Sequence, residues 1–204
     1  ACGIDLKKTY LQKNRKSNFR KKYNLKRDDF IILYVGRPVA RKGFKVLLNL
    51  WDKGLKSSKD TSLFLCGCNE NDVKKEIKKL PKNIFSLGFV DNIEEIYENS
   101  DVLILPSFHE GFPYAVLEAL AANCIVVGNN VLGIKSIIKN NFNGFLVTNN
   151  DISAYIKTIN FLKSNKKIRT RIANQGFLEV KKYSRVDFLL KYKEYLNKIV
   201  RLKK

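Results

Sequence analysis

The sequence predicts an α/β domain built on a doubly wound parallel sheet of about six strands, followed by C-terminal helices. Three observations point to this fold: short apolar runs, a glycine or proline where those runs stop, and helical segments between them. The run at 31–36 ends in glycine and the run at 101–106 ends in proline. A strand that is apolar throughout is buried on both faces, which is typical of a parallel sheet with right-handed crossovers.

The elements can be placed in order along the chain. A first helix is predicted from Gly43 to about residue 57, because Phe44, Leu47 and Trp51 lie on one side of it. An amphipathic helix is predicted within residues 184–200. The six predicted strands are 31–36, 62–66, 84–87, 102–105, 124–127 and 144–147, and the other helices lie near 70–79, 92–98, 113–122 and 152–164.

These elements predict one domain over residues 1–204. Residues 31–164 are expected to form a Rossmann-like core, residues 1–30 an exposed connector or helix, and residues 165–204 the C-terminal helices. With 204 residues, 45% of them hydrophobic, the chain can bury one sizeable core, which excludes a disordered or fibrous protein. It contains no methionine, and we expect it to be a piece of a longer protein.

Composition also bears on location and on metal chemistry. No apolar run reaches the roughly 20 residues that span a bilayer, and the N-terminus has no signal-peptide core, so we expect a cytoplasmic protein. The four cysteines lack zinc-binding spacing, and Cys66 and Cys68 are interpreted as small buried apolar side chains. The sequence has no Asp-x-Asp and no metal-spaced His/Cys cluster, so we expect no bound metal and no cofactor.

Positive charge is concentrated at the two ends of the chain. The net charge is +20, of which residues 1–30 carry +7 and residues 160–204 carry +11. Solvated basic faces and a peripheral attraction to an anionic membrane surface, at the inner membrane, both remain open explanations. A nucleic-acid partner is not expected, because no zinc-finger, helix-turn-helix or aromatic-interleaved basic motif accompanies the charge.

The most informative segment is 110–118, which reads Glu-Gly-Phe-Pro-Tyr-Ala-Val-Leu-Glu. It follows the predicted strand 102–105, so Glu110 lies in a strand-to-helix loop, at the sheet edge where ligands bind. Pro113 suits the first turn of the next helix. Glu118 lies two turns beyond Glu110, where it would reach another part of the same elongated ligand. A ligand with hydroxyl groups at both ends and charge in the middle fits this spacing.

Backbone N–H groups and cations are placed to hold the charged part of such a ligand. Free N–H groups near Phe112 and Tyr114 offer an anion site at a helix start. The loop 36–43, Gly-Arg-Pro-Val-Ala-Arg-Lys-Gly, brings Arg37 and Lys42 to another helix N-terminus. This loop matches neither the Walker pattern nor G-x-G-x-x-G, which argues against ATP hydrolysis and dinucleotide redox chemistry.

Two further features are less specific. Residues 87–90, Leu-Gly-Phe-Val, end a strand at the same edge of the sheet and could sandwich a base. His109 is the only histidine and adjoins Glu110, so a structural role and an acid–base or substrate contact both stay open for it.

Taken together, these residues resemble the C-terminal donor-binding half of a family-4 glycosyltransferase with the GT-B fold, a group 1 enzyme. The resemblance spans nearly the whole chain, and Gly3-Ile4-Asp5 is similar to the stretch that enters the donor domain in this family. It implies that the N-terminal acceptor domain, with the family's usual catalytic histidine, is absent from these residues. The matching motifs are Gly36-Arg37 with Lys42-Gly43, Gly88-Phe89-Val90, and Glu110-Gly-Phe-Pro-x-x-x-x-Glu118-Ala119.

The resemblance implies a site for a nucleotide-diphosphate sugar, with a UDP-sugar favoured over a GDP-sugar. Glu110 would contact the transferred sugar and Glu118 the ribose hydroxyls. Arg37 and Lys42 would neutralise the diphosphate leaving group, a stabilisation that matters most in the transition state, so they and Glu110 are the expected catalytic residues. The residues expected to bind the donor are Gly36, Phe89, Val90, Gly111, Phe112, Pro113, Tyr114, Leu117 and Glu118.

The family resemblance implies transfer with retained anomeric configuration and without a metal ion, to a polysaccharide, a glycolipid or another glycan. This piece alone is expected to bind donor and to transfer poorly without the acceptor domain or a partner chain. Two alternatives stay open: half of a nucleotide-sugar epimerase with the same architecture, and a non-catalytic module that binds nucleotides or nucleic acid.

Overall fold

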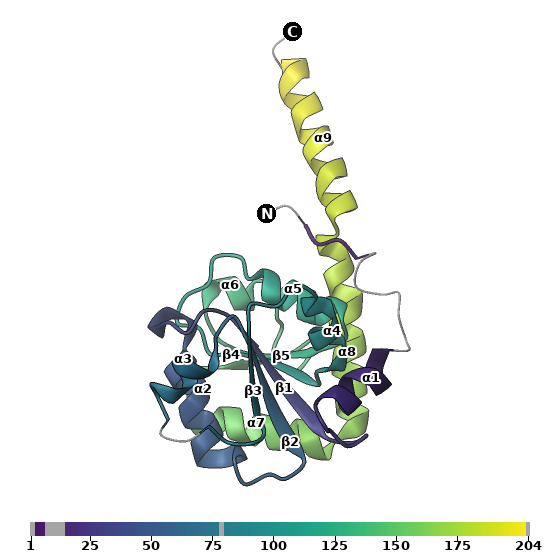
Figure 1. The fold of residues 1–204 in the computed structure, drawn as a ribbon. Helices are drawn as coiled ribbons and strands as arrows, with labels where there is room; N and C mark the ends of the chain where they lie inside the picture. The colour runs from purple at the N-terminus through teal and green to yellow at the C-terminus, as the bar shows by residue number, and fades with distance from the viewer. Residues whose placement is uncertain (1–2, 7–14, 78–79, 203–204) are drawn as a thin grey trace.

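Six parallel strands form the central sheet, in the spatial order β3-β2-β1-β4-β5-β6. The structure, a computed structural model, describes residues 3–6, 15–77 and 80–202. Helices cover both faces of the sheet, as the doubly wound prediction requires (Figure 1). The strands are β1 Phe30–Val35, β2 Thr61–Cys66, β3 Ile84–Gly88, β4 Val102–Leu105, β5 Ile125–Asn129 and β6 Phe145–Val147.

The helices agree with the predicted order, with three corrections. The first helix is α-helical only to Leu50 and continues as a π-helical turn, Trp51–Leu55. The helix expected near 70–79 ends at Lys74, and residues 78–79 lie outside the described residues. The short helix Leu132–Lys135 was not predicted. The helices are α1 Arg15–Lys22, α2 Phe44–Leu50, α3 Glu70–Lys74, α4 Ile93–Asn99, α5 Tyr114–Ala121, α6 Leu132–Lys135, α7 Ile152–Ser164, α8 Lys166–Val180 and α9 Arg185–Leu202, with 3₁₀ turns at Ala40–Lys42 and Lys181–Tyr183.

The core consists of two apolar layers, one on each face of the sheet. Alternate residues of β1 supply both layers: Ile32 and Tyr34 enter one, and Ile31 and Leu33 enter the other. The helices α2 and α7 cover the first layer, and α4, α5 and α8 contribute to the second. Because both faces are covered, strands of continuous apolar residues are stable here, which is why the apolar runs were accurate guides.

The N-terminal segment is attached more closely than an exposed connector would be. Phe19 of α1 is only 1% exposed and its ring lies 5.3 Å from that of Phe64 in β2. Tyr23 contacts the same ring edge-on. The charged composition of residues 7–27 concealed this aromatic anchor, and residues 7–14 lie outside the described residues.

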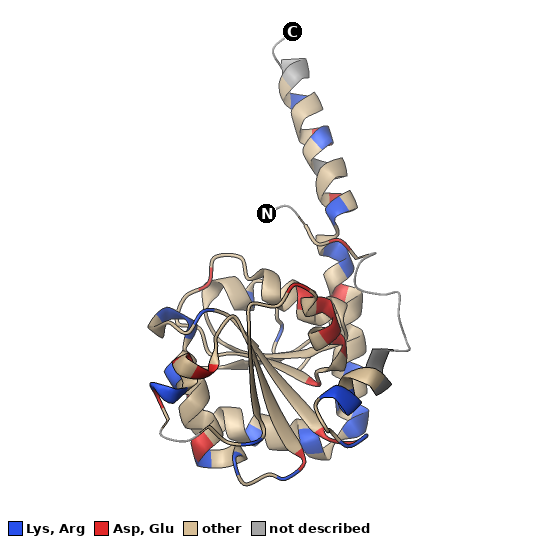
Figure 2. Cartoon of the chain, viewed as in Figure 1, with Lys and Arg blue, Asp and Glu red and all other residues tan. Residues whose placement is uncertain are grey.

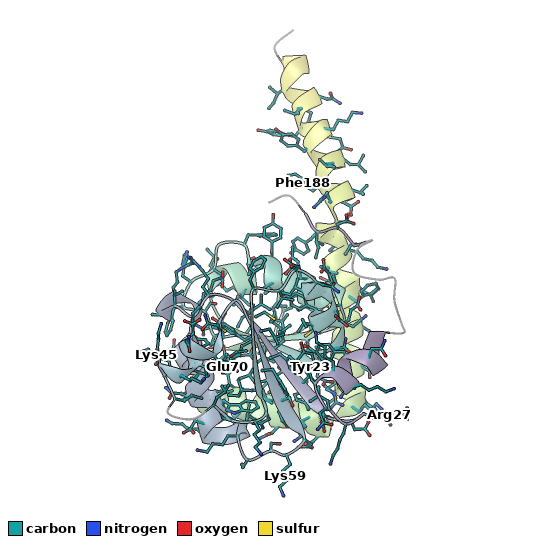
Figure 3. The ribbon with its side chains drawn as sticks, viewed as in Figure 1. Tyr23, Arg27, Lys45, Lys59, Glu70 and Phe188 are labelled. Carbon is teal, nitrogen blue, oxygen red and sulfur yellow. The ribbon has the colours of Figure 1, made fainter. Side chains whose placement is uncertain are left out.

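The last helix, α9, projects away from the body of the domain (Figures 1 and 3). It is the amphipathic helix that the sequence predicted, but its apolar side chains are not buried by the described residues. The chain near Ile4 runs beside the base of α9, where Ile4 and Tyr183, and Arg185 and Ile4, share backbone hydrogen bonds of 2.8 Å. No helix in the described part of the chain is long and apolar enough to cross a membrane. The exposed apolar residues of α9 are Val186, Leu189, Leu190, Tyr192, Tyr195, Leu196 and Ile199.

The strand order reverses between β1 and β4, which are neighbours in the sheet although three α-helices and two strands separate them in sequence. Such a switch point leaves a crevice at the carboxyl ends of the two strands. The loop after β1 and the loop after β4 must therefore flank one another. Gly43 brings them together, since a Cβ on it would lie 2.0 Å from the carbonyl oxygen of Pro106.

Replacing Gly43 by alanine tests this close approach. Gly43 has a φ of +69° as well as no room for a Cβ, so Gly43→Ala is expected to lower the free energy of unfolding by about 2–4 kcal/mol. Gly88→Ala is the matched control, because Gly88 has a φ of +65° and nothing within 4 Å of its Cβ position. The control should lose only about 1–2 kcal/mol in urea denaturation. Equal losses in the two variants would contradict the steric role of Gly43.

Candidate functional site

Two loops meet at the switch point and form the centre of the candidate site. The loop after β1 contains a short 3₁₀ turn, Ala40–Lys42, and ends at Gly43 against Pro106. The backbone N–H of Phe108, in the loop after β4, donates to the carbonyl oxygen of Arg41 at 2.9 Å. This hydrogen bond and the glycine contact fix the loops side by side, so residues 68 positions apart in sequence can form an ion pair.

That ion pair joins Lys42 to Glu110. Lys42 Nζ lies 2.7 Å from Glu110 Oε1, and the side chains are 23% and 7% exposed. A carboxylate this deeply buried needs a charged partner, and Lys42 supplies it. The structure thus brings together two residues that the sequence predicted separately, one for phosphate and one for sugar.

Backbone N–H groups stand beside this pair. No backbone carbonyl in the described part of the chain accepts a hydrogen bond from the N–H of Gly111 or Phe112. Pro113 is buried and has extended backbone angles. It therefore occupies the N-cap position of α5, and the first turn of the helix begins at Tyr114. Behind the loop, a Cβ on Gly133 would lie 2.2 Å from the carbonyl oxygen of Glu110, so α6 supports the turn from below.

The second carboxylate, Glu118, has a neutral partner. The hydroxyl of Tyr97, on α4, donates to Glu118 Oε2 at 2.9 Å. Burial raises the pKa of the Glu118 carboxyl; the hydrogen bond from Tyr97 opposes this rise, and the charge of Glu94 adds to it. Burial also raises the pKa of the Tyr97 hydroxyl well above its usual value, so Tyr97 remains a proton donor.

A hollow of about 180 Å³ opens at Glu118. Tyr97 and Tyr114 form part of its wall, and the chain at 3–5 and the first residue of α9, Arg185, form another part. Tyr97, Glu94 and Arg185 also line this hollow and were not predicted as site residues. Tyr97 looks like an ordinary core residue of a helix, and only the fold places its hydroxyl opposite Glu118.

The charges at this edge of the sheet are separated by sign. In the ribbon of Figure 2, acidic positions gather on α4 and basic ones lie in the loop after β1, and Glu94 of α4 lines the same hollow as Glu118. Arg37 is exposed, and no side-chain hydrogen bond or ion pair is found for its guanidinium among the described residues. An anionic group is therefore attracted toward Arg37 and Lys42, and a neutral hydroxyl-bearing group suits the hollow at Glu118.

The turn after β3 presents an aromatic ring to solvent. Phe89 is 91% exposed, while Val90 is half-buried against the core. Gly88 adopts a φ of +65° that turns the chain outward here, and its N–H bonds to the carbonyl of Cys68 at 2.9 Å. Gly36 is tied in the same manner to Cys66, at 2.9 Å, so the ends of the first three strands are joined.

Some predicted residues occupy other positions. Leu117 is 0% exposed and lies in the core, so its side chain supports α5 and does not face the site, contrary to the expectation that it binds donor. His109 is exposed and makes none of the hydrogen bonds described for this site. Cys66 and Cys68 are buried, as interpreted from the sequence, and burial raises the pKa of each thiol to about 12. Within the described ranges, no group of three or more His, Cys, Asp or Glu side chains could hold a metal ion.

Comparison with known proteins agrees with this architecture. A relative from Escherichia coli, named UDP-Gal:alpha-D-GlcNAc-diphosphoundecaprenol alpha-1,3-galactosyltransferase, is 30% identical over 203 residues, covering 92% of this chain and 52% of the relative. The C-terminal domain of LpcC, a group 1 glycosyl transferase from Francisella tularensis, superposes with a TM-score of 0.77 at 27% identity, covering 89% of this chain and 99% of that one.

A longer structure shares the fold at lower identity. Anabaena HepE, solved in complex with UDP-glucose, superposes with a TM-score of 0.85 at 19% identity, covering 96% of this chain and 56% of that one. The chain spans about half the length of curated relatives that it matches: 52% of the relative from Escherichia coli and 54% of one from Campylobacter jejuni. The family model for glycosyl transferases group 1 matches residues 15–178. This match covers most of the chain and includes the β1 loop, the β3 turn and both carboxylates, and the chain belongs to the group 1 glycosyl transferases.

Proposed function

We propose that this chain is the donor-binding half of a retaining, metal-independent glycosyltransferase. It would bind a nucleotide-diphosphate sugar and, with an acceptor domain, transfer the sugar to a polysaccharide, a glycolipid or another glycan. The observation that carries the proposal is the Lys42–Glu110 pair at 2.7 Å, because it sets a phosphate-binding cation beside a sugar-binding carboxylate. Transfer breaks the bond between those two parts of the donor.

Each part of the donor has a matching set of groups in this proposal. The diphosphate binds Arg37 and Lys42, which stabilise the charge that develops as the glycosidic bond breaks. The sugar binds Glu110 and the N–H groups of the turn at 111–114, and the ribose hydroxyls bind Glu118, whose carboxylate accepts charge-assisted hydrogen bonds. The base lies at Phe89 and Val90. The 91% exposure of the Phe89 ring supports this last assignment, since the ring is available for stacking.

UDP is the nucleotide that we favour. The relative from Escherichia coli is named for UDP-Gal, and HepE was solved with UDP-glucose. Neither name fixes the sugar for this chain. The E. coli relative is also named for a diphosphoundecaprenol-linked acceptor, which supports a lipid-linked glycan as the acceptor class here. A cytoplasmic position at an anionic membrane surface would bring the basic chain, with its net charge of +20, to such an acceptor.

We propose that an acceptor domain covers the apolar side of α9. The exposed leucines and tyrosines of this helix are too numerous to be isolated surface residues, and such an exposed apolar surface is typical of an interaction site. The chain at Ile4 reaches the base of α9, so a domain that precedes it would start beside the helix. The chain's coverage of 52% of its E. coli relative leaves room for such a domain in the relative's length.

The free energy of unfolding of the free chain tests whether the ionised Glu118 carboxylate destabilises the fold. Because burial raises the pKa of its carboxyl above the unfolded value, the ionised form lowers stability at neutral pH. This loss fades as the pH falls from the folded pKa to the unfolded pKa and is gone below it. Glu118→Gln is therefore expected to raise the free energy of unfolding at pH 7 and to have little effect in acid. Urea denaturation across this pH range is the measurement. A variant that is less stable than the parent at pH 7 would contradict the assigned cost.

Calorimetric titration with UDP, GDP and ADP tests the donor site. Comparing ligands with and without ribose hydroxyls, in the parent and in two variants, tests the position of the ribose. UDP should bind most tightly. Glu118→Gln should weaken UDP about tenfold or more, from the loss of roughly 1.5 kcal/mol, and Tyr97→Phe should weaken it to a smaller degree because it only orients the carboxylate.

The ligand to compare with UDP is 2′,3′-dideoxyuridine diphosphate, which lacks the hydroxyls that Glu118 would bind. Its affinity should be the same in the parent and in both variants. If the variants weaken the dideoxy ligand as much as UDP, then Glu118 and Tyr97 only support the fold. If no nucleotide binds, the proposed function fails. Incubation with a UDP-sugar and no acceptor separates the epimerase alternative, which alone predicts an epimerised product.

A further inference from the structure

A second hollow lies at the carboxyl ends of β5 and β6, next to Phe108 in the loop after β4. Its volume is about 350 Å³. Neither carboxylate lines it, and its lining includes no charged residue, in contrast to the loop after β1. Ligands of parallel sheets bind at this edge, so its position is suitable for a substrate. The lining residues are Phe108, Asn129, Asn130, Val131, Asn149 and Asn150.

Asn129 builds the wall of this hollow. Its Nδ2 donates to the carbonyl of Ser107 at 3.1 Å, and its Oδ1 accepts from the N–H of Asn130 at 3.1 Å and of Asn150 at 3.2 Å. These bonds join the ends of β4 and β5 to the loop after β6. The hollow is therefore held open by a buried hydrogen-bonded frame, not by the chance spacing of surface side chains.

Asn150, which lines this hollow, has a side-chain donor without a hydrogen-bond partner in the described part of the chain. Asn150 is only 7% exposed, and its Oδ1 accepts from the hydroxyl of Tyr155 at 3.4 Å. Its Nδ2 is buried and has no hydrogen-bond partner in the described part of the chain, and the same holds for the hydroxyl of Ser107 behind the wall. An unsatisfied buried donor lowers the stability of a fold, so it calls for a missing partner.

The chemistry of the lining indicates the partner. Carboxamides both donate and accept hydrogen bonds, which matches hydroxyl groups, and the absence of cations disfavours phosphate. The ring of Phe108 is 57% exposed at the same hollow and offers an apolar surface. A pyranose ring has hydroxyls at its edge and an apolar face, so it can use both.

We propose that this hollow, defined by Phe108, Asn149 and Asn150, is a saccharide subsite that takes a neutral sugar ring of the acceptor glycan. Phe108 lies in the same loop as Glu110, two residues before it, so a ring in this hollow would lie near the donor sugar. The identification of the ring as acceptor rests on the proposed function; the binding of a neutral saccharide at the hollow does not.

Asparagine side-chain NH₂ groups give a direct readout in nitrogen–proton correlation spectra. The probes are the methyl α-glycosides of glucose, galactose and N-acetylglucosamine, with inorganic phosphate as the charged control, each titrated with and without UDP. At least one glycoside should shift the Asn149 and Asn150 signals saturably, and phosphate should not. A response to phosphate alone, or to none of the probes, overturns the proposal and leaves a water-filled hollow.

Glycine variants at asparagines with left-handed backbone angles are expected to fold, so they test binding and not folding. Asn149, Asn150 and Asn123 have φ values of +54°, +52° and +56°, which glycine adopts without strain. Asn149→Gly, at an exposed residue, and Asn150→Gly should each weaken glycoside binding several-fold, whereas Asn123→Gly, at the other end of β5, should not. Undiminished binding in Asn149→Gly and Asn150→Gly overturns the proposal. UDP affinity in the same samples tests the proposed function separately, so a failure of one is distinguishable from a failure of the other.

Discussion

The contact between the loop after β1 and the end of β4 is the constraint on which the rest of the site depends. Gly43 permits it, because any side chain at this residue would meet the carbonyl oxygen of Pro106. The contact places Lys42 at 2.7 Å from Glu110, at the point where the strand order reverses. A parallel sheet opens a crevice at every such reversal, and here the crevice is furnished with one cation and one carboxylate in direct contact.

The two carboxylates of the 110–118 segment are held differently, and the difference fits the roles proposed for them. Glu110 is 7% exposed and is neutralised by a lysine, so both members of the pair can exchange partners when a charged ligand with hydroxyl groups arrives. Glu118 is held only by a neutral hydroxyl, from Tyr97, and burial raises the pKa of its carboxyl. Its charge lowers the stability of the free chain. That arrangement makes sense where a ligand completes the hydrogen bonding.

The sequence was informative where burial dictates residue type. All six strands were predicted to within two residues, because strands covered on both faces must be apolar throughout. Both carboxylates and the cationic loop were predicted as well, since the order of elements fixes which loops meet. What the sequence could not supply depends on contacts between distant segments. Phe19 packs against the ring of Phe64 in β2, Leu117 turns into the core, and Tyr97 on α4 donates to Glu118 on α5. The amide-lined hollow comes from four asparagines that, read singly, look like loop residues.

The most direct test is to titrate Lys42→Met and Glu110→Gln calorimetrically with both UDP and UDP-glucose. If the pair joins a phosphate group to a sugar group, Lys42→Met should weaken both ligands by about tenfold or more, through the lost charge-assisted contact. Glu110→Gln should weaken UDP-glucose and leave UDP unchanged or tighter, because Lys42 is then released to the phosphate. Equal weakening of UDP and UDP-glucose by Glu110→Gln, or an unchanged affinity for UDP in Lys42→Met, would contradict the account.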